Sequence, residues 1–418
     1  MNREKFVITG IGCILPNTTD NNTMWENLSE GKSQIDFIKN VDTSNFSVKV
    51  GAEIVDFDYR SFLPDLSEKF AHKYSKEMLI GMSALANCQK DAKIQKGDIA
   101  PEKMGIIEST SRATLNFWSR VYEGNQYGDK DLINGENLIQ GLNGTTASMY
   151  AIYSDIQGMV TTISCACVGG HHAIHTAINE LSCGNEDVMF VLGTEFPICK
   201  PVLGIYSDKK TAVLSKECKE PKKALKPYNS ERDGFVLGEG SVALCIEKLS
   251  HAKKRGAHIY CEVLGAESIN EAEHGTRMDL TGKKNAKMLK RLLEKIDKKP
   301  EEVSYYCAHG TGTRYNDMTE CRIVRLIHGE NCPPIGSIKP IYGHMFGGAG
   351  VLNVAASAMM IEKQTLCPTI NTGVIDEECN LDHVIEGARK TKVNLIISMT
   401  HAMGSQSAMV ALGEYKDE

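Results

Sequence analysis

The sequence lacks the long hydrophobic runs, the positive net charge and the signal segment that mark several common classes of protein. No stretch approaches 18 uncharged apolar residues, so no membrane-spanning helix is expected. The opening MNREKFVITGIGCILP has too short an apolar run for a secretory signal and is expected to form a strand. A formal net charge of −6 gives no basic field for nucleic acid or anionic lipid. We therefore expect neither a membrane nor a nucleic acid as a partner.

Cysteine, in contrast, is plentiful but is not arranged as a framework. Fourteen cysteines are spread over 418 residues, which indicates free thiols in a reducing compartment, so a cytoplasmic location is expected. Apolar residues make up 42% and charged residues 24%, the usual balance of a globular protein. The length suits two modest domains or one large one.

Short apolar runs rich in β-branched residues alternate with longer segments that have apolar residues at helical spacing. Runs such as KFVITGIGC, KMGIIEST, MVTTIS, DVMFVLGTEF and VNLIISMT are expected to be strands, and SKEMLIGMSALANCQKDA and KNAKMLKRLLEKI to be helices. This alternation predicts an α/β fold with strands buried between helices. Residues 123–143 and 216–233 are expected to be surface excursions. Each half of the chain contains a strand, then a sharp turn with Cys or His, then a helix. This weak internal repeat predicts two fused halves, residues 1–255 and 256–418.

The stretch TTISCACVGGHHAIHTA (161–177) is the first candidate site. A strand, a tight turn and a helix would place Cys167 at the positive end of the helix, where a thiolate is favoured. Cys165 would belong to the end of the strand. Three other interpretations are open at this point: an inert buried thiol, a redox pair, or a metal site that includes His171 and His175.

Two further junctions of the same kind strengthen the case for a nucleophile. In YYCAHGTGTRYNDMTE, His309 stands where a strand breaks into a Gly/Thr loop, before a helix opened by Asn316 or Asp317. In IGSIKPIYGHMFGGAGV, Lys339 precedes a turn and His344 lies at the bend. One cysteine and two histidines at such junctions indicate a convergent site.

The chain resembles the β-ketoacyl-[acyl carrier protein] synthases of the thiolase superfamily, the condensing enzymes of fatty acid and type II polyketide assembly. CACVGG, HGTGT and KPIYGHMFGGAG match the family's nucleophile and histidine motifs in order, and PYNSERDGFVLGEGSVALCIEKLSHAKKRGA is close to its signature between the halves. The resemblance implies a thiolase fold, two related α/β halves in an αβαβα arrangement. It covers nearly the whole chain.

The resemblance also implies a role for each motif residue. Cys167 would accept the acyl group, and His309 and His344 would bind the malonyl thioester carbonyl. Lys339 would be the lysine beside the histidines. Asp317 and Glu320 would be the acids that support this lysine and the active-site loops, and Thr311 and Thr313 would line the pantetheine tunnel. No metal or bound cofactor is implied, because the acyl carrier protein delivers the phosphopantetheine arm.

The C-terminal loop departs from the family pattern. Where relatives have Gly-Phe-Gly-Gly, this chain has SMTHAMGSQSAMV, and Ala402 is assigned to the phenylalanine position. The backbone N–H groups of Cys167 and Ala402 would form the oxyanion hole. The bulky gate is then either absent or replaced by His401 or Met403. Arg314 also stands where many relatives have proline.

The predicted function is decarboxylative condensation of malonyl-carrier protein with an acyl or poly-β-ketoacyl chain on Cys167, in type II polyketide synthesis. Fatty acid elongation is the close alternative, and a catalytically silent, chain-length-shaping subunit is a further one. A thiolase-like degradative enzyme would need a second cysteine in SMTHAMGSQSAMV, which has none.

The implied partners are the acyl carrier protein and a second synthase subunit. The protein would be a homodimer or a heterodimer with a cysteine-less paralogue, joined through MVTTIS. Carrier proteins are acidic, so a local basic patch is expected to dock them, although a solvated lysine face is an equally good interpretation. The candidate docking residues are Lys69, Lys73, Lys209 and Lys210.

Overall fold

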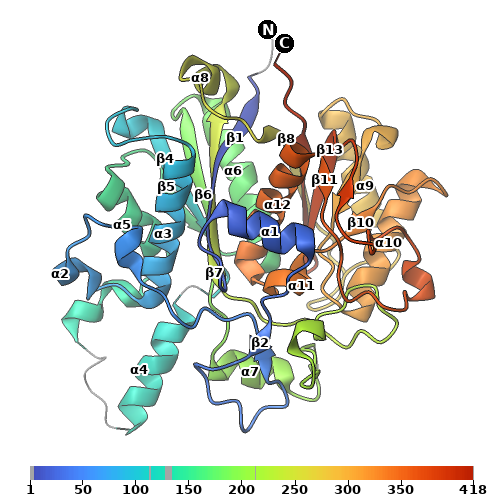
Figure 1. Ribbon diagram of the computed structural model, residues 1–418, viewed down its shortest axis with the longest axis horizontal. Helices are drawn as coiled ribbons and strands as arrows, with labels where there is room; N and C mark the ends of the chain where they lie inside the picture. Colours follow the sequence, from blue (N-terminus) through green and yellow to red (C-terminus); the bar gives the residue numbers. More distant parts are fainter. Residues whose placement is uncertain (1–3, 113, 128–133, 212, 418) are drawn as a thin grey trace.

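The computed structural model describes residues 4–112, 114–127, 134–211 and 213–417, and a single mixed sheet of ten strands runs through it (Figure 1). The strand order is β10-β9-β13-β14-β8-β1-β7-β6-β4-β5. One half of the sheet holds β1 (Phe6–Ile14), β4 (Met104–Ser109), β5 (Val160–Ile163), β6 (Val188–Glu195) and β7 (Gly240–Lys248). The other half holds β8 (Cys261–Asn270), β9 (Tyr305–Cys307), β10 (Ile335–Gly336), β13 (Leu395–Ala402) and β14 (Gln406–Gly413).

The two halves of the sheet have the same topology. When the five strands of each half are numbered in chain order, both halves show the same arrangement. From the outer edge of the sheet to its middle, the order is third, second, fourth, fifth, first. The halves meet where Phe6–Ile8 of β1 pair antiparallel with Cys261–Val263 of β8. This repeat agrees with the predicted pair of related α/β halves. The exact boundary at residue 255 stays a prediction.

Helices form three layers around the sheet. Helices α3 (Lys76–Asp91) and α5 (Thr145–Ser154) cover the outer face of the first half, and α9 (Lys283–Lys295) and α10 (Arg314–His328) lie on the outside of the second (Figure 1). Helices α6 (Gly169–Cys183) and α12 (Ala349–Lys363) lie between the halves and contact strands of both. Of the 15 residues of α12, 13 are buried, as its nearly uncharged sequence requires. The αβαβα arrangement of a thiolase fold is confirmed.

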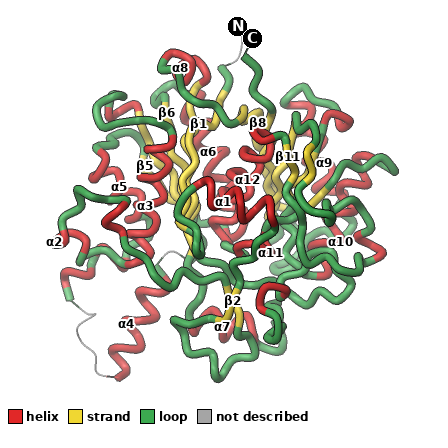
Figure 2. The backbone as a smooth tube through the Cα atoms, in the orientation of Figure 1, coloured by secondary structure: helices red, strands yellow, loops and turns green. Residues whose placement is uncertain are grey.

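Smaller elements and long loops surround these layers. The helices are α1 (Asn21–Glu30), α2 (Glu68–Ala71), α4 (Leu115–Tyr127), α7 (Lys200–Ser207), α8 (Leu249–Lys254) and α11 (Lys339–Tyr342). Two small sheets pair β2 (Asp36–Phe37) with β3 (Val50–Gly51), and β11 (Thr365–Leu366) with β12 (Arg389–Lys390). Figure 2 shows loops gathered around β2 and α7. Among the described residues, no helix combines the length and apolar character needed to cross a bilayer.

The surface excursion predicted at 216–233 is wrong for its second half. Leu225 and Tyr228 are fully buried, and the Tyr228 ring stacks on His383 with ring centroids 3.9 Å apart. The polar composition of this segment suggested a surface loop. Instead, the Tyr228 N–H donates a hydrogen bond to the buried Asp317 carboxylate, which fixes the segment against α10. Of the other predicted excursion, residues 128–133 lie outside the described part of the chain, and α4 extends into its start.

Candidate active site

Cys167 lies in a tight turn between β5 and α6. The strand ends at Ile163, and a 3-10 turn over Ala166–Val168 leads directly into the helix. Ala166 has a φ of 45°, a left-handed conformation that is uncommon for a residue other than glycine and typical of strained functional turns. Among the described residues, Cys167 lines the adjacent cavity and Cys165 does not. The predicted strand–turn–helix is therefore present.

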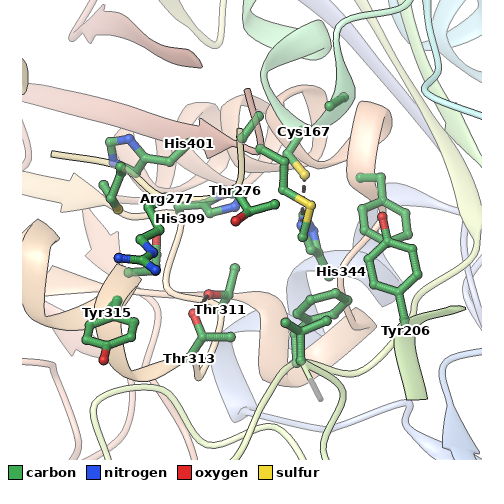
Figure 3. Close-up of a pocket in the computed structure, with 18 of the residues that line it drawn as sticks. Cys167, Tyr206, Thr276, Arg277, His309, Thr311, Thr313, Tyr315, His344 and His401 are labelled. Carbon is green, nitrogen blue, oxygen red and sulfur yellow. Dashed lines mark hydrogen bonds between the residues drawn. The ribbon is translucent and has the colours of Figure 1, made fainter. Parts of the chain in front are cut away.

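The two histidines from the second half of the chain converge on this cysteine (Figure 3). His309 follows β9, and His344 follows α11. The distance from Cys167 Sγ to His344 Nε2 is 3.2 Å. The imidazole rings of His309 and His344 meet edge to face, with centroids 5.0 Å apart. The convergence predicted from three separate junctions is thus what the fold produces.

Both imidazoles are in their neutral form. Burial lowers the pKa of His309 and of His344 well below the usual value for histidine, and the positive charge of Lys339 lowers them further. A neutral imidazole carries one N–H, so each histidine can donate one hydrogen bond into the cavity without bringing a charge. The Nδ1 atoms of both rings are buried and have no hydrogen-bond partner among the described residues.

The thiol of Cys167 is not the ready thiolate that its place before a helix predicts. Burial raises its pKa to about 12, and the nearby charges of Lys339 and Arg112 only partly oppose this effect. His344 Nε2, at 3.2 Å, is the group placed to take the thiol proton as the sulfur attacks.

These pKa shifts predict how alkylation of Cys167 depends on pH. The thiolate fraction of a group with a pKa near 12 rises about tenfold per pH unit throughout the range below that value. The rate of Cys167 modification by iodoacetamide, followed by peptide mass spectrometry, should therefore rise steeply from pH 6 to 9 without levelling off. A plateau beginning near pH 7 would instead indicate a preformed thiolate–imidazolium pair and would contradict this prediction.

Lys339 and the two predicted acids, Asp317 and Glu320, differ in how they contact the two histidines. Lys339 is 2% exposed, and burial lowers the pKa of its ammonium against the opposing charge of Glu320. Glu320 accepts hydrogen bonds from the backbone N–H groups of His309 (2.6 Å) and Gly310 (2.7 Å), so it holds the histidine loop directly. No hydrogen bond or ion pair between described residues joins Lys339 to Glu320 or to Asp317.

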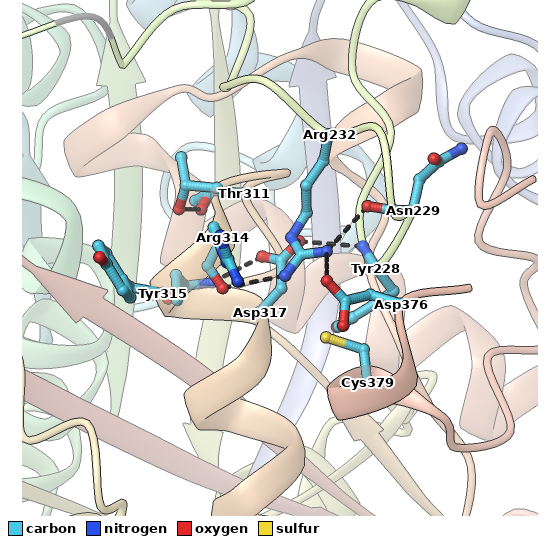
Figure 4. A network of polar contacts seen from close by, with 12 residues as sticks. Tyr228, Asn229, Arg232, Thr311, Arg314, Tyr315, Asp317, Asp376 and Cys379 are labelled. Atoms are coloured by element: carbon cyan, nitrogen blue, oxygen red, sulfur yellow. Dashed lines mark hydrogen bonds and ion pairs between the residues drawn. The ribbon is translucent and has the colours of Figure 1, made fainter. Parts of the chain in front are cut away.

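Asp317 supports the site indirectly, through Tyr228 and Arg232. Its carboxylate accepts from the Tyr228 N–H at 3.0 Å and lies 3.6 Å from the buried Arg232 guanidinium, which also pairs with Asp376 (Figure 4). Burial raises the pKa of Asp317 to about 6, although Arg232 opposes this. The helix α10 that carries both acids begins at Arg314, earlier than the sequence predicted.

The site opens into a cavity of about 360 Å³. Thr311 and Thr313 line it, with their hydroxyl oxygens 2.8 Å apart, at the end occupied by Arg277 and Tyr315 (Figure 3). This is the position expected for a pantetheine tunnel. Lys69, Lys73, Lys209 and Lys210 are not among the described lining residues. Lys209 and Lys210 are exposed between two residues that do line the cavity, Tyr206 and Val213.

The altered C-terminal loop forms one wall of the cavity. Ala402 and Met403 line it, and β13 ends at Ala402. The neighbouring His401 is 5% exposed, contacts the His309 ring with centroids 6.0 Å apart, and shares a 2.8 Å hydrogen bond with Ser407. Both predicted candidates for the missing gate, His401 and Met403, therefore line the cavity, and His401 is the one that contacts the His309 ring.

The metal interpretation of the first motif does not fit the structure. His171 is turned toward the second half of the sheet, where it shares hydrogen bonds with Ser398 and Thr400, and burial lowers its pKa to about 3. The ligand atoms that do come together belong to Cys167, His309 and His344, which lie within 4.8 Å of one another. A thiolate with two imidazoles is also a possible zinc set. Metal analysis of the purified protein distinguishes the two uses of these side chains.

Comparison with known proteins agrees with this geometry. The family model for the β-ketoacyl synthase N-terminal domain matches residues 3–252, and the model for the C-terminal domain matches residues 260–373. The chain belongs to the β-ketoacyl synthase family. The family resemblance inferred from CACVGG, HGTGT and KPIYGHMFGGAG is confirmed.

Relatives from both branches of the family match the whole chain. The 3-oxoacyl-[acyl-carrier-protein] synthase 2 of Coxiella burnetii is 30% identical over 100% of both chains. The tetracenomycin polyketide synthase ketoacyl synthase alpha subunit of Streptomyces glaucescens is 28% identical, covering 99% of this chain and 98% of its own. A type II polyketide ketosynthase solved in complex with its acyl carrier protein superposes with a TM-score of 0.89, at 26% identity, over 99% of this chain and 100% of its own.

Several residues of this β-ketoacyl synthase site carry no sequence signal of their own. The rings of Phe235 and Phe346 pack against His344, with centroids 5.3 and 4.9 Å away. Tyr206 and Arg112 line the cavity on the Cys167 side. Phe346 lies two residues after His344 in KPIYGHMFGGAG, which was its only sequence signal, and Phe235 lies in PYNSERDGFVLGEG, where no histidine is adjacent. Arg112, in ESTSRAT, belongs to no motif.

Proposed function

We propose that the protein is a condensing acyltransferase that joins a malonyl unit to an acyl chain held on Cys167. The observation that carries the proposal is the 3.2 Å contact between Cys167 Sγ and His344 Nε2, with the neutral His309 ring beside it in the same cavity. Both curated relatives are named as enzymes of this class.

The first step is transfer of an acyl group to the enzyme. Cys167 Sγ forms a bond to the acyl carbonyl carbon as the bond from that carbon to the carrier sulfur breaks. The thiol proton passes through His344 to the departing sulfur. The backbone N–H groups of Cys167 and Ala402 hold the developing oxyanion, which is the largest usual contribution to such a step.

The second step makes the carbon–carbon bond. The malonyl carboxylate leaves as carbon dioxide, and its bonding electrons form an enolate whose oxygen accepts hydrogen bonds from His309 and from His344, the latter now in the tautomer with its proton on Nε2. The enolate carbon attacks the acyl carbonyl, the bond to Cys167 breaks, and the released thiolate takes up a proton. Two neutral donors suit this role because a buried imidazolium would itself be costly and would hold the enolate too tightly to react.

Type II polyketide synthesis is the pathway we propose, with fatty acid elongation as the alternative. The relatives include enzymes named for each pathway. The silent-subunit alternative is disfavoured because Cys167, His309 and His344 are all present and within 4.8 Å of one another. The 14 cysteines, all in the described residues, form no disulfide, which fits the cytoplasmic location we propose.

The partners we propose are an acyl carrier protein, which supplies the phosphopantetheine arm, and a second synthase subunit. β5 (Val160–Ile163) is the last strand of the ten-stranded sheet, and its outer edge pairs with no described strand. Strand β5 is therefore the edge available to the same strand of a partner. Its sequence, VTTI, lies within the interface segment predicted from MVTTIS.

Intact-mass analysis after exposure to an acyl carrier protein donor tests the function. We expect a covalent acyl adduct on the wild type and on Cys165→Ala, and none on Cys167→Ala. Addition of malonyl-carrier should then discharge the adduct into a product two carbons longer. An adduct that persists in Cys167→Ala, or no adduct with any donor in the presence of its partner subunit, would overturn the proposal.

A further inference from the structure

The cavity contains a cation that the condensation chemistry does not use. Arg112 follows β4 and lines the cavity together with Cys167. Its guanidinium lies over the rings of Phe346, 5.0 Å from the centroid, and Tyr206, 5.1 Å from the centroid, and it donates a hydrogen bond to the Tyr206 hydroxyl. Tyr206 lies beside Cys167 and His344 and away from Thr313, Tyr315 and Arg277 (Figure 3). Arg112 is therefore on the acyl side of the nucleophile.

The hydrogen-bonding capacity of Arg112 is not used up by the protein. Its Nε atom is buried and has no hydrogen-bond partner among the described residues. None of the ion pairs between described residues involves its guanidinium, and Glu195, the neighbouring acid, accepts instead from the backbone N–H groups of Ser111, Arg112 and Gly347. Arg112 as a whole is partly buried, but a buried N–H such as that of its Nε is costly unless something else in the site accepts from it.

The space beyond Arg112 also contains many polar groups. A second cavity, of about 300 Å³, shares Ser111 and Arg112 with the catalytic cavity. Seven of its nine lining residues carry a hydroxyl, an amide or a guanidinium, among them Thr114, Asn143, Thr162 and Ser164. An alkyl chain that entered this space would cover these groups without accepting a hydrogen bond from any of them.

We propose that Arg112 is a specificity-determining residue that selects acyl groups bearing an oxygen along the chain, and disfavours plain alkyl chains. The inference rests on the proposed function and names its substrate class. A ketone oxygen or a carboxylate satisfies the same N–H groups, and a guanidinium fork suits either. A site built to donate to an oxygen rejects an analogue without it, because the donors are then left unpaired.

The test compares acylation of Cys167 by the N-acetylcysteamine thioesters of octanoic, 3-oxooctanoic and octanedioic acid, from intact-mass time courses. We expect the wild type to prefer at least one oxygen-bearing donor over octanoyl by about 10- to 100-fold in kcat/KM, the cost of leaving one charged donor unpaired. Arg112→Met should remove or invert this preference, and Arg112→Lys should retain part of it. The two oxygenated donors distinguish a ketone from a carboxylate.

Two controls separate selectivity from folding and from the proposed function. Arg277→Met removes a cation from the opposite end of the cavity and should leave the ratio between donors unchanged. The melting temperature of each variant reports on folding. Equal acylation by all three donors, or a preference unchanged in Arg112→Met, would overturn this inference alone. No acylation by any donor would overturn the proposed function together with it.

Discussion

Replacing His309 with alanine should slow condensation by about 100- to 1000-fold, the usual cost of losing one preorganised oxyanion donor, while Cys167 still accepts an acyl group. The reason is positional. His344 Nε2 is the atom that contacts the sulfur, at 3.2 Å, whereas His309 makes no hydrogen bond to the sulfur and lies edge to face with the His344 ring. His344→Ala should therefore slow both acylation and condensation. Single-turnover measurements of each step give the two rates separately.

His72→Ala is the matched control for these variants. This histidine is exposed after α2, and it does not line the catalytic cavity among the described residues. Its loss should change neither rate. If His309→Ala slowed acylation as strongly as condensation, the division of labour between the two histidines would be wrong, and His309 would have to act on the sulfur or on the shape of the cavity.

Replacing Arg232 with methionine should destabilise the protein by about 3–5 kcal/mol, the usual cost of removing one partner from a buried ion pair. The Arg232 side chain is 2% exposed and lies between Asp317, which is fully buried, and Asp376 (Figure 4). It also donates to the backbone carbonyls of Asn229 and Arg314. The variant removes the positive charge between the two carboxylates, together with the hydrogen bonds that Arg232 donates to Asp376 and to the two backbone carbonyls.

Chemical denaturation of the wild type and the variant measures this effect. Lys223→Ala supplies the comparison, because the ion pair of Lys223 with Glu220 leaves their side chains 65% and 62% exposed and should contribute little. A loss for Arg232→Met no larger than for Lys223→Ala would show that water or chain relaxation replaces the buried pair. The segment 224–233 would then be far less constrained than its contacts indicate.

The sequence was sufficient to predict the fold and the three central side chains. Cys167 and His309 come after short apolar strands, His344 comes after α11, and each has glycine nearby, so their local structure could be predicted from the adjacent sequence. The layered architecture followed from the alternation of strands and helices.

The parts that could not be predicted depend on contacts between distant segments. Arg112 comes next to Tyr206, 94 residues later in the chain, and nothing in ESTSRAT indicates that its side chain enters the cavity. Burial, which depends on the whole fold, raises the pKa of the Cys167 thiol and so opposes the thiolate expected from the helix dipole. His401 was considered only as a possible replacement for the gate, and its contact with His309 depends on how β13 lies beside β9.

The repeated topology leaves the protein with two copies of the turn that carries the nucleophile. In the first half the turn Ala166–Val168 leads into α6, and in the second the turn Phe346–Gly348 leads into α12 in the same way, with Phe346 at a φ of 32°. The position equivalent to Cys167 is Gly347, where a side-chain Cβ would lie 2.6 Å from the Ser111 nitrogen. The second copy has no room for any side chain there. If the chain arose by doubling of one half, the doubling would thus have given a single reactive turn, Ala166–Val168. The equivalent turn, Phe346–Gly348, packs against it.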